Sequence, residues 1–278
     1  MQVALYRVEV PGDGVRIARG GLEGPAELVP LHDLAGLDAP SLRATLDGPG
    51  EGPLPSNART LAPVSPIQEV WAAGVTYERS RDARVEETSH ATPYDLVYEA
   101  ERPELFFKAQ GWRVRGPLEP IGIRADSGWD VPEPELALVL DPDLRVFAYA
   151  VGNDVSSRSI EGENPLYLPQ AKTYDGSCAL GPALVAADAV APPFDVRLEI
   201  VRAGSSVYSG ATSTDHMKRS FEDLAEHLGR ALSLPNGAVL LTGTGIVPDP
   251  GVSLRVGDVV RIEIEHVGTL ENRVELVG

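Results

Sequence analysis

The chain has 278 residues, of which 43% are hydrophobic and 23% charged, the proportions of an ordinary globular protein. Its formal net charge of −17 comes from 41 acidic and 24 basic residues, and such a surface repels nucleic acid and anionic membranes. No apolar run reaches the length of about 18 residues that a membrane-spanning helix needs. We therefore expect neither nucleic acid nor a membrane as a partner.

The N-terminus and the single cysteine bear on the compartment. The first ten residues, MQVALYRVEV, alternate like a strand and lack the basic and then apolar order of a signal peptide. Cys178 cannot form a disulfide within the chain, and its small and apolar neighbours favour a buried hydrophobic role over a nucleophilic one. We expect a cytoplasmic protein.

The first 64 residues predict a small N-terminal domain with a linker. Short apolar runs at 3–10 and 15–19 predict strands, and a short helix is expected near 31–46. The stretch 48–55 is dense in Gly and Pro, which is typical of a linker or an exposed loop. The predicted domains are therefore 1–64 and 65–278.

Helices are few in the predicted main domain. Residues 76–90 are charged and contain neither Gly nor Pro, which predicts a surface helix or a lid. Residues 220–234 give the clearest helix, because Ser220 can cap it with Asp223 at the third position and its apolar residues fall on one face. Pro, Asn and Gly at 235–237 are expected to end it.

Strands account for most of the remaining sequence. Residues 260–265 alternate apolar and charged side chains, the pattern of a half-buried antiparallel strand, and 272–277 would close the sheet. Because strands do not alternate regularly with helices, the expected fold class is a β-dominated α+β fold.

Three carboxylates stand at the ends of apolar runs. Glu133 and Glu135 are two residues apart, so on a strand they point the same way, and Pro134 between them predicts a strand start, an edge or a bulge. Asp154 follows the next apolar segment, in a predicted turn at 152–154. A solvated strand end is the commoner explanation of a lone Glu-x-Glu pair. With Asp154 added, a solvated end and a metal site both remain open.

Oxygen ligands of this kind suit a hard divalent cation, so the metal would be Mg²⁺, Mn²⁺ or Ca²⁺. The five histidines show no zinc-like spacing. Open positions on Mg²⁺ can take a 2-oxo acid, and the ion would stabilise an enolate. Lys172 beside such an ion would lose its proton more easily and serve as a base, with a surface lysine as the alternative.

Residues 242–245 (TGTG) have a Gly-x-Gly pattern without the continuation of a dinucleotide fingerprint or the lysine of a P-loop. A tight turn after a strand is the expected structure there.

Six segments in the same order resemble the fumarylacetoacetate hydrolase family over about residues 70–278. They are 74–77, 133–135, 152–158, the Lys172 segment to 182, 241–244, and 256–260 with 268–270. The resemblance implies a mixed β-sandwich roll that forms a homodimer or homotetramer. It also implies an Mg²⁺ site whose ligands are Glu133, Glu135 and Asp154. The family's substrate-contacting residues map to Arg158, Glu161, Lys172 and Thr244.

One departure from the family pattern bears on the reaction. Members that hydrolyse or decarboxylate carry a histidine and then an acid after the first motif, where this chain has Ser80 and Ala83. Without that pair, water lacks its usual base, so hydrolysis of fumarylacetoacetate is not expected. Ser80 is instead expected to contact the substrate.

Residues 76–84, 103–108 and 161–172 resemble a branch of the family that dehydrates 2-keto-3-deoxy sugar acids. The branch implies a metal-dependent lyase that converts 2-keto-3-deoxy-D-arabinonate to 2,5-dioxopentanoate through a metal-stabilised enolate. Lys172 would remove the C3 proton, and Glu104 is the candidate acid for the departing C4 hydroxyl. Two alternatives stay open. One is an isomerase, decarboxylase or hydrolase of a 2-oxo acid or diacid, and the other is a metal-dependent binding protein without turnover.

Overall fold

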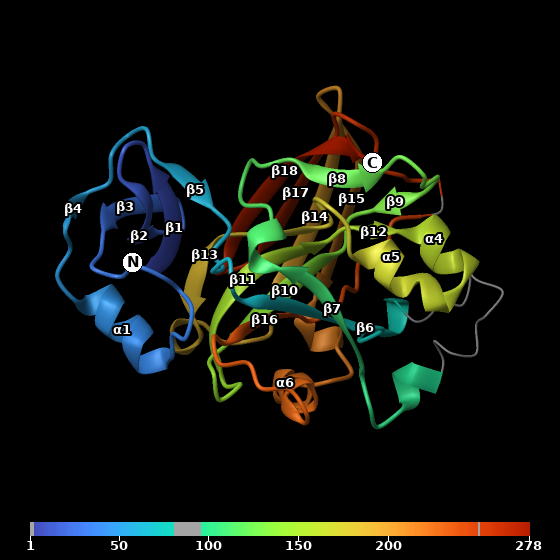
Figure 1. Cartoon of the computed structure of the whole chain (residues 1–278). Coiled ribbons are helices and arrows are strands. Elements are labelled where there is room, and N and C mark those ends of the chain that lie inside the picture. The colour runs from blue at the N-terminus through green and yellow to red at the C-terminus, as the bar shows by residue number, and fades with distance from the viewer. Residues whose placement is uncertain (1–2, 81–95, 250) are drawn as a thin grey trace.

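A computed structural model describes residues 3–80, 96–249 and 251–278 of the chain (Figure 1). Most of the described elements are strands of two large sheets, and these confirm the β-dominated α+β prediction. The first sheet contains β1 (Ala4–Val10), β2 (Gly14–Gly21), β3 (Gly24–Leu28), β4 (Gly52–Pro53), β5 (Arg59–Leu61), β6 (Glu69–Gly74), β7 (Glu104–Gln110), β10 (Pro134–Leu140), β11 (Val146–Asp154), β13 (Cys178–Ala186) and β16 (Ala238–Leu241). Its order is β4-β3-β2-β1-β13-β11-β10-β16-β6-β7, with β5 paired to β1.

The second sheet has five strands in the order β15-β14-β17-β18-β8. They are β8 (Ile121–Arg124), β14 (Asp195–Arg202), β15 (Ser205–Ser213), β17 (Val259–Ile264) and β18 (Gly268–Val277). A small third sheet pairs β9 (Asp130–Val131) with β12 (Ser156–Ser157). Ladders are antiparallel except β16–β6 and β18–β8, so the sheets are mixed, as expected.

The helices are short. Those whose two ends both lie in the described residues are α1 (Ala39–Asp47), α4 (Arg158–Glu163), α5 (Leu168–Lys172) and α6 (Phe221–Gly229), with 3₁₀ turns η1 (Gly111–Arg113), η2 (Pro165–Tyr167), η3 (Ala187–Ala189) and η4 (Thr214–His216). No helix in the described ranges has both the length and the apolar content to cross a membrane. In Figure 1, α4 and α5 lie together beside β12, on the side of the molecule away from the N-terminal strands.

Strand β10 explains where the site can form, because it is buried along its whole length and its two faces meet different cores. Leu136 and Leu138 belong to the core between the two large sheets. Ala137 and Val139 belong to a second core on the opposite face of the large sheet, where α1 also packs. Since side chains alternate along a strand, Glu135 shares the face of Ala137 and Val139.

The N-terminal part differs from its predicted form in two places. The helix starts at Ala39 and not near residue 31, because Asp38 caps it by accepting a hydrogen bond from the Ser41 amide at 2.8 Å. The predicted linker contains β4, which pairs with β3. Strand β1 also pairs with β13 of the main part. The division into 1–64 and 65–278 stays a prediction.

In the main part, Ser220 caps α6 as predicted, since its side chain accepts from the Asp223 amide at 3.1 Å. The helix ends at Gly229 and not at 234, so the predicted apolar face is shorter than expected. The alternation at 260–265 is confirmed, with Val260, Ile262 and Ile264 buried in β17. Most of the helix or lid predicted at 76–90 lies outside the described residues.

Candidate active site

The three predicted metal ligands meet in space. One carboxylate oxygen from each of Glu133, Glu135 and Asp154 lies within 4.8 Å of the others, and all three side chains are buried. Pro134 begins β10, as predicted, and puts Glu133 just before the strand and Glu135 on it. Asp154 ends strand β11 and does not stand in the predicted turn. Its amide donates to the Glu133 carbonyl at 3.0 Å, which ties the two strand ends together.

The glycine-containing segment after β16 holds Glu135. Gly243 has a φ of 87°, which favours glycine, and its amide donates to Glu135 Oε2 at 2.6 Å. The tight turn predicted for 242–245 is wrong, because these residues form an irregular segment with only a bend at Gly245, and this segment anchors a carboxylate of the site.

Lys172 ends helix α5 with its ammonium among the carboxylates. Nζ lies 3.0 Å from Glu133 Oε1 and 2.8 Å from Asp154 Oδ2, and it donates to Ser156 Oγ at 2.6 Å. Its Nζ also lies 5.5 Å from the centre of the Phe106 ring, and the side chain is almost fully buried. A surface position for this lysine, the alternative considered from the sequence, is wrong.

A second lysine was missed as a site residue. Lys108 on β7 is completely buried, and its ammonium forms a short ion pair with Asp154 Oδ1. It also donates to the Val155 carbonyl at 3.0 Å and to the Lys172 carbonyl. Lys108 therefore fixes both a predicted metal ligand and the backbone of the predicted base. A lysine inside the apolar run ELFFKAQ was the available sequence signal.

Arg158 extends this network toward the start of α4. Its guanidinium lies 3.2 Å from Glu133 Oε1 and donates to Glu161 Oε2 at 3.1 Å. Its amide donates to the Trp129 carbonyl at 2.8 Å, so the helix starts in a fixed place. Both side chains of this pair are buried, as substrate-contacting groups in a closed site would be.

The remaining predicted residues line the same cavity. Its lining includes Ser80, Glu104, Glu133, Asp154, Glu161, Lys172 and Thr244. Glu104, Phe106 and Lys108 alternate along β7, so one face of this strand supplies three side chains to the site. The structure thus brings together all nine residues proposed from the sequence, while their chemical roles stay predictions.

The charges of the site support a divalent cation. Four buried carboxylates, counting Glu161, face the cations of Lys108, Lys172 and Arg158, so one formal negative charge remains. Burial, followed by the charges of Asp154 and Glu133, raises the pKa of Glu135 well above its ordinary value. A hard cation among these oxygens would remove that penalty, so the donor set fits Mg²⁺.

Cys178 begins β13 close to the site but does not suit nucleophilic chemistry. It is a buried thiol, and burial raises its pKa to about 12. At neutral pH it stays protonated, as expected for a small hydrophobic residue.

Asp130 on β9 gives a prediction about stability. Burial raises its pKa from 3.8 to about 6, and Oδ1 has no hydrogen-bond partner in the described part of the chain. A raised carboxyl pKa means that the folded state binds the proton more tightly, so stability falls as pH rises from about 4 to about 6. Asp130→Asn is expected to raise the free energy of unfolding by about 1–3 kcal/mol at pH 8 and to have little effect below pH 4.

Urea unfolding across this pH range would test the expectation for Asp130. Asp126→Asn is the matched control, because Asp126 is exposed and Arg124 lowers its pKa, so this variant should not be stabilised at pH 8. A stability difference for Asp130→Asn that does not change with pH would contradict the assignment.

Comparison with known proteins places this site in a family. A family model described as fumarylacetoacetate (FAA) hydrolase C-terminal matches residues 69–275. A probable 2-keto-3-deoxyxylonate dehydratase of Haloferax volcanii is 50% identical over 212 residues, which are 76% of this chain and 73% of that protein. The 2-dehydro-3-deoxy-D-arabinonate dehydratase of Saccharolobus solfataricus is 43% identical over 221 residues, 77% of this chain and 74% of that protein.

Among solved structures, 2-keto-3-deoxy-D-arabinonate dehydratase complexed with magnesium and 2,5-dioxopentanoate matches with a TM-score of 0.84 and 34% identity. The match covers 98% of this chain and 99% of that chain. The family model spans well over half of the present sequence and includes every carboxylate and cation of the cavity described above. The chain belongs to the fumarylacetoacetate hydrolase family.

Proposed function

We propose that this protein is a metal-dependent dehydratase that converts 2-keto-3-deoxy-D-arabinonate to 2,5-dioxopentanoate. The observation that carries the proposal is the single cavity lined by Glu133, Asp154, Lys172 and Glu104. It places candidate metal ligands, a base and an acid around one small volume. The names of two relatives at 50% and 43% identity, both dehydratases of 2-keto-3-deoxy sugar acids, support the same reaction.

The two relatives' substrate names are chemically compatible. Oxidation at C2 and loss of oxygen at C3 leave C4 as the one stereocentre of the acid. D-Arabinonate and D-xylonate share their configuration at C4, so the D forms of both names describe one molecule. A cavity suited to either named substrate therefore suits the other.

Glu133, Glu135 and Asp154 would hold the ion, which we propose to be Mg²⁺, as in the related complex with magnesium. When bound, it would neutralise these carboxylates and draw electron density from the 2-oxo acid group, which makes the C3 hydrogens more acidic. Mn²⁺ and Ca²⁺ accept the same oxygen ligands.

Lys172 and Glu104 would move the protons. Nζ of Lys172 takes a proton from C3, and the carboxyl of Glu104 donates one to the C4 hydroxyl, which leaves as water. A later proton shift from C5 to C3 converts the resulting alkenol to an enol at C4 and C5, and transfer of the enol's hydroxyl proton to C4 gives the aldehyde of 2,5-dioxopentanoate. Ser156 Oγ, which accepts from Lys172 at 2.6 Å, keeps Nζ in place during this exchange.

The other residues of the cavity would position the substrate. Arg158 is the candidate partner of the substrate's anionic group, with Glu161 holding the guanidinium. Thr244 and Ser80 supply hydroxyl groups from two further segments of the lining. The described residues that line the cavity include no histidine for water activation, which supports elimination over hydrolysis as the proposed reaction.

The setting of the enzyme is part of the proposal. We propose a cytoplasmic homodimer or homotetramer that acts on a small 2-oxo acid. The family resemblance supports the assembly, and the buried thiol of the single cysteine suits a reducing compartment.

Gly74→Ala gives a test of Glu104 that leaves the acid itself in place. These residues face each other across β6 and β7, and a Cβ at position 74 would lie 2.1 Å from Glu104 Oε2. The carboxylate must move, while the fold can adapt because only the end of a flexible side chain is displaced. We expect turnover to fall on the order of 10²-fold with little change in melting temperature. Gly128→Ala is the control, since a Cβ there meets nothing within 4 Å; equal turnover of the two variants would remove Glu104 from the mechanism.

The test of the reaction uses metal-stripped enzyme and 2-keto-3-deoxy-D-arabinonate, with 2,5-dioxopentanoate as the measured product. We expect product after addition of Mg²⁺ and none before. Metal binding without product from this substrate would reject the proposed dehydratase. Product from other 2-oxo acids would then favour the isomerase or decarboxylase alternative, and ligand-dependent stabilisation without turnover would favour a binding protein.

A further inference from the structure

Thr76 follows strand β6 and lies behind the candidate metal site, and it is not one of the described residues that line the cavity. The residue is 1% exposed, and its Oγ1 donates a hydrogen bond to the Thr242 carbonyl at 2.7 Å. The next amide along the chain, that of Gly243, donates to Glu135 Oε2 at 2.6 Å. Thr76 is therefore connected to a candidate metal ligand through a single backbone peptide group.

The two hydrogen bonds act on opposite ends of that peptide group. The carbonyl of Thr242 and the amide of Gly243 belong to one planar unit, and in a trans peptide they point in opposite directions. Holding the carbonyl toward Thr76 therefore directs the amide toward Glu135. The hydroxyl at one end and the carboxylate at the other also polarise the unit in the same sense, so each hydrogen bond strengthens the other.

Glycine at position 243 permits this contact but does not hold it. Its φ is 87°, and a Cβ there would lie 2.1 Å from Thr76 Oγ1, so the close approach of the hydroxyl requires glycine. Glycine also adopts positive and negative φ about equally readily, so the peptide group before it can rotate at little cost. A rotated peptide would turn its carbonyl oxygen toward the Glu135 carboxylate, where the two would repel. The hydrogen bond from Thr76 opposes this rotation.

Both partners of that hydrogen bond are held by other segments. The amide and Oγ1 of Thr242 donate to the Leu136 carbonyl at 3.1 and 3.0 Å, on the strand that carries the ligand. The Thr76 carbonyl accepts from the Lys218 amide at 3.0 Å. Val75, just before it, has a φ of 52°, which β-branched residues rarely adopt and which persists only where surrounding contacts impose it. The hydroxyl is therefore held in place by contacts of the protein itself.

We propose that Thr76 is a positioning residue of the metal site, which acts on Glu135 through the peptide group between Thr242 and Gly243. With Oε2 held by the amide, the carboxylate of Glu135 cannot turn freely, so less order has to be imposed when a cation binds. Groups that orient a metal ligand commonly contribute 10–100-fold to metal affinity. This role rests on the proposed metal-dependent function, because Glu135 matters here as a ligand.

Calorimetric titration of the metal-stripped full chain with Mg²⁺ tests the proposal. Thr76→Val keeps the shape of the side chain without its hydroxyl and is expected to weaken Mg²⁺ binding at least about tenfold. Thr76→Ser keeps the hydroxyl and should bind nearly as tightly as the wild type. Thr76→Cys, whose thiol is a weak donor, should lie between them. Thr45→Val is the matched control, because it also removes a hydroxyl that donates to a backbone carbonyl, that of Ser41 at 2.8 Å.

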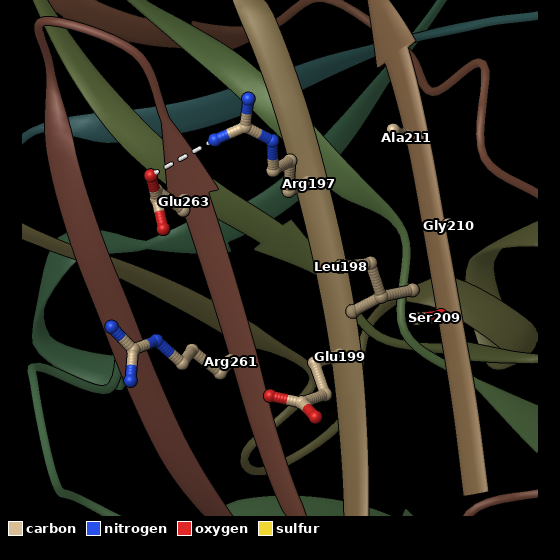
Figure 2. Close-up of a pocket in the computed structure, with 8 residues that line it drawn as sticks. All are labelled: Arg197, Leu198, Glu199, Ser209, Gly210, Ala211, Arg261 and Glu263. Atoms are coloured by element: carbon tan, nitrogen blue, oxygen red, sulfur yellow. Dashed lines mark hydrogen bonds and ion pairs between the residues drawn. The ribbon is translucent and has the colours of Figure 1, made fainter. Parts of the chain in front are cut away.

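A second control is needed because Mg²⁺ also collects at the surface of a chain with a formal net charge of −17. Figure 2 shows Glu199 and Glu263 on the outer face of the second sheet, where Glu263 pairs with Arg197 at 3.3 Å. Surface groups of this kind attract cations weakly, and salt at about 0.15 M screens them. Glu199→Gln is therefore expected to leave the tight Mg²⁺ site unchanged.

Turnover separates positioning of the ligand from a general loss of stability. In Thr76→Val, the Mg²⁺ concentration at half-maximal turnover should rise about tenfold, while turnover at saturating Mg²⁺ stays near the wild-type value. Equal Mg²⁺ affinity of Thr76→Val and the wild type would overturn this inference alone. Binding by Thr76→Ser and Thr76→Cys as weak as that of Thr76→Val, or a fall in maximal turnover with an unchanged Mg²⁺ requirement, would also overturn it. A wild type that binds no Mg²⁺ would overturn the proposed metal site together with this inference.

Discussion

Lys172→Met is expected to lower turnover of 2-keto-3-deoxy-D-arabinonate by about 10²–10⁴-fold, the usual contribution of a positioned proton-transfer group. Methionine keeps the length and much of the packing of the buried side chain beside Phe106, but it has no atom that can take a proton. With Mg²⁺ present, which would replace the lost positive charge beside Glu133 and Asp154, the fold should survive. Single-turnover measurements with saturating substrate would separate this loss of chemistry from a loss of binding.

Metal binding distinguishes a base from a purely structural lysine. The ammonium of Lys172 lies 3.0 Å from Glu133 Oε1 and 2.8 Å from Asp154 Oδ2, so it competes with any cation for these oxygens. Lys172→Met should bind Mg²⁺ at least as tightly as the wild type while turning over far more slowly. Lys218→Met is the control, because Lys218 pairs with Glu99 at the surface. Near-wild-type turnover of Lys172→Met would refute the assigned role.

Lys108→Met is expected to lower the free energy of unfolding of the metal-free protein by about 3–5 kcal/mol, the cost of leaving one partner of a buried ion pair alone. The ammonium of Lys108 contacts Asp154 Oδ1 in a fully buried position and donates to two carbonyl groups. Its removal leaves the carboxylate beside Glu133 and Glu135 with less compensation. Lys218→Met should change stability by at most about 1 kcal/mol.

Added Mg²⁺ should reverse part of this loss. An ion held by Asp154 replaces the missing positive charge, and a ligand that binds the folded state stabilises it. The difference between Lys108→Met and the wild type is thus expected to shrink as Mg²⁺ is raised. Urea unfolding at several Mg²⁺ concentrations measures it. A loss below about 1 kcal/mol in metal-free protein would show that Lys108 does not hold the site together.

The sequence predicted the part of the fold that depends on simple alternation. Val260, Ile262 and Ile264 alternate with charged residues and are buried in β17. Ser220 was predicted to cap a helix and does so. In both cases, the local pattern and the tertiary structure favour the same conformation, so local reasoning was sufficient.

Local reasoning was wrong where tertiary pairing or chain termination dominates. Gly152, Asn153 and Asp154 have turn propensity, yet they form strand because β11 is hydrogen-bonded to β10 on one side and β13 on the other. Helix α6 ends at Gly229 although the apolar spacing continues beyond it. Helical periodicity does not determine how many turns the surrounding core can cover.

The site residues also divide into those that local sequence could predict and those that depend on tertiary packing. Glu133, Glu135 and Asp154 could be selected because acids at strand ends stand out in the sequence. Lys172 was proposed as a base from its place beside them, and the family resemblance supplied the role of Arg158. Lys108 was not selected, because a single lysine in a strand is commonly solvent-exposed. Its burial follows from how β7 packs against residues distant in sequence, which no local pattern encodes.

The order of strands has a consequence for how the site opens. The ligand-bearing strands β10 and β11 are paired on both sides within the large sheet, whereas β7, which carries Glu104 and Lys108, ends the described strand order. Backbone amides of central strands exchange with solvent mainly through global unfolding, and those near a sheet edge exchange through local opening. Deuterium should therefore label β7 before β10 and β11. Local opening that displaces Glu104 and Lys108 on β7 would leave the metal-ligand strands β10 and β11 in place.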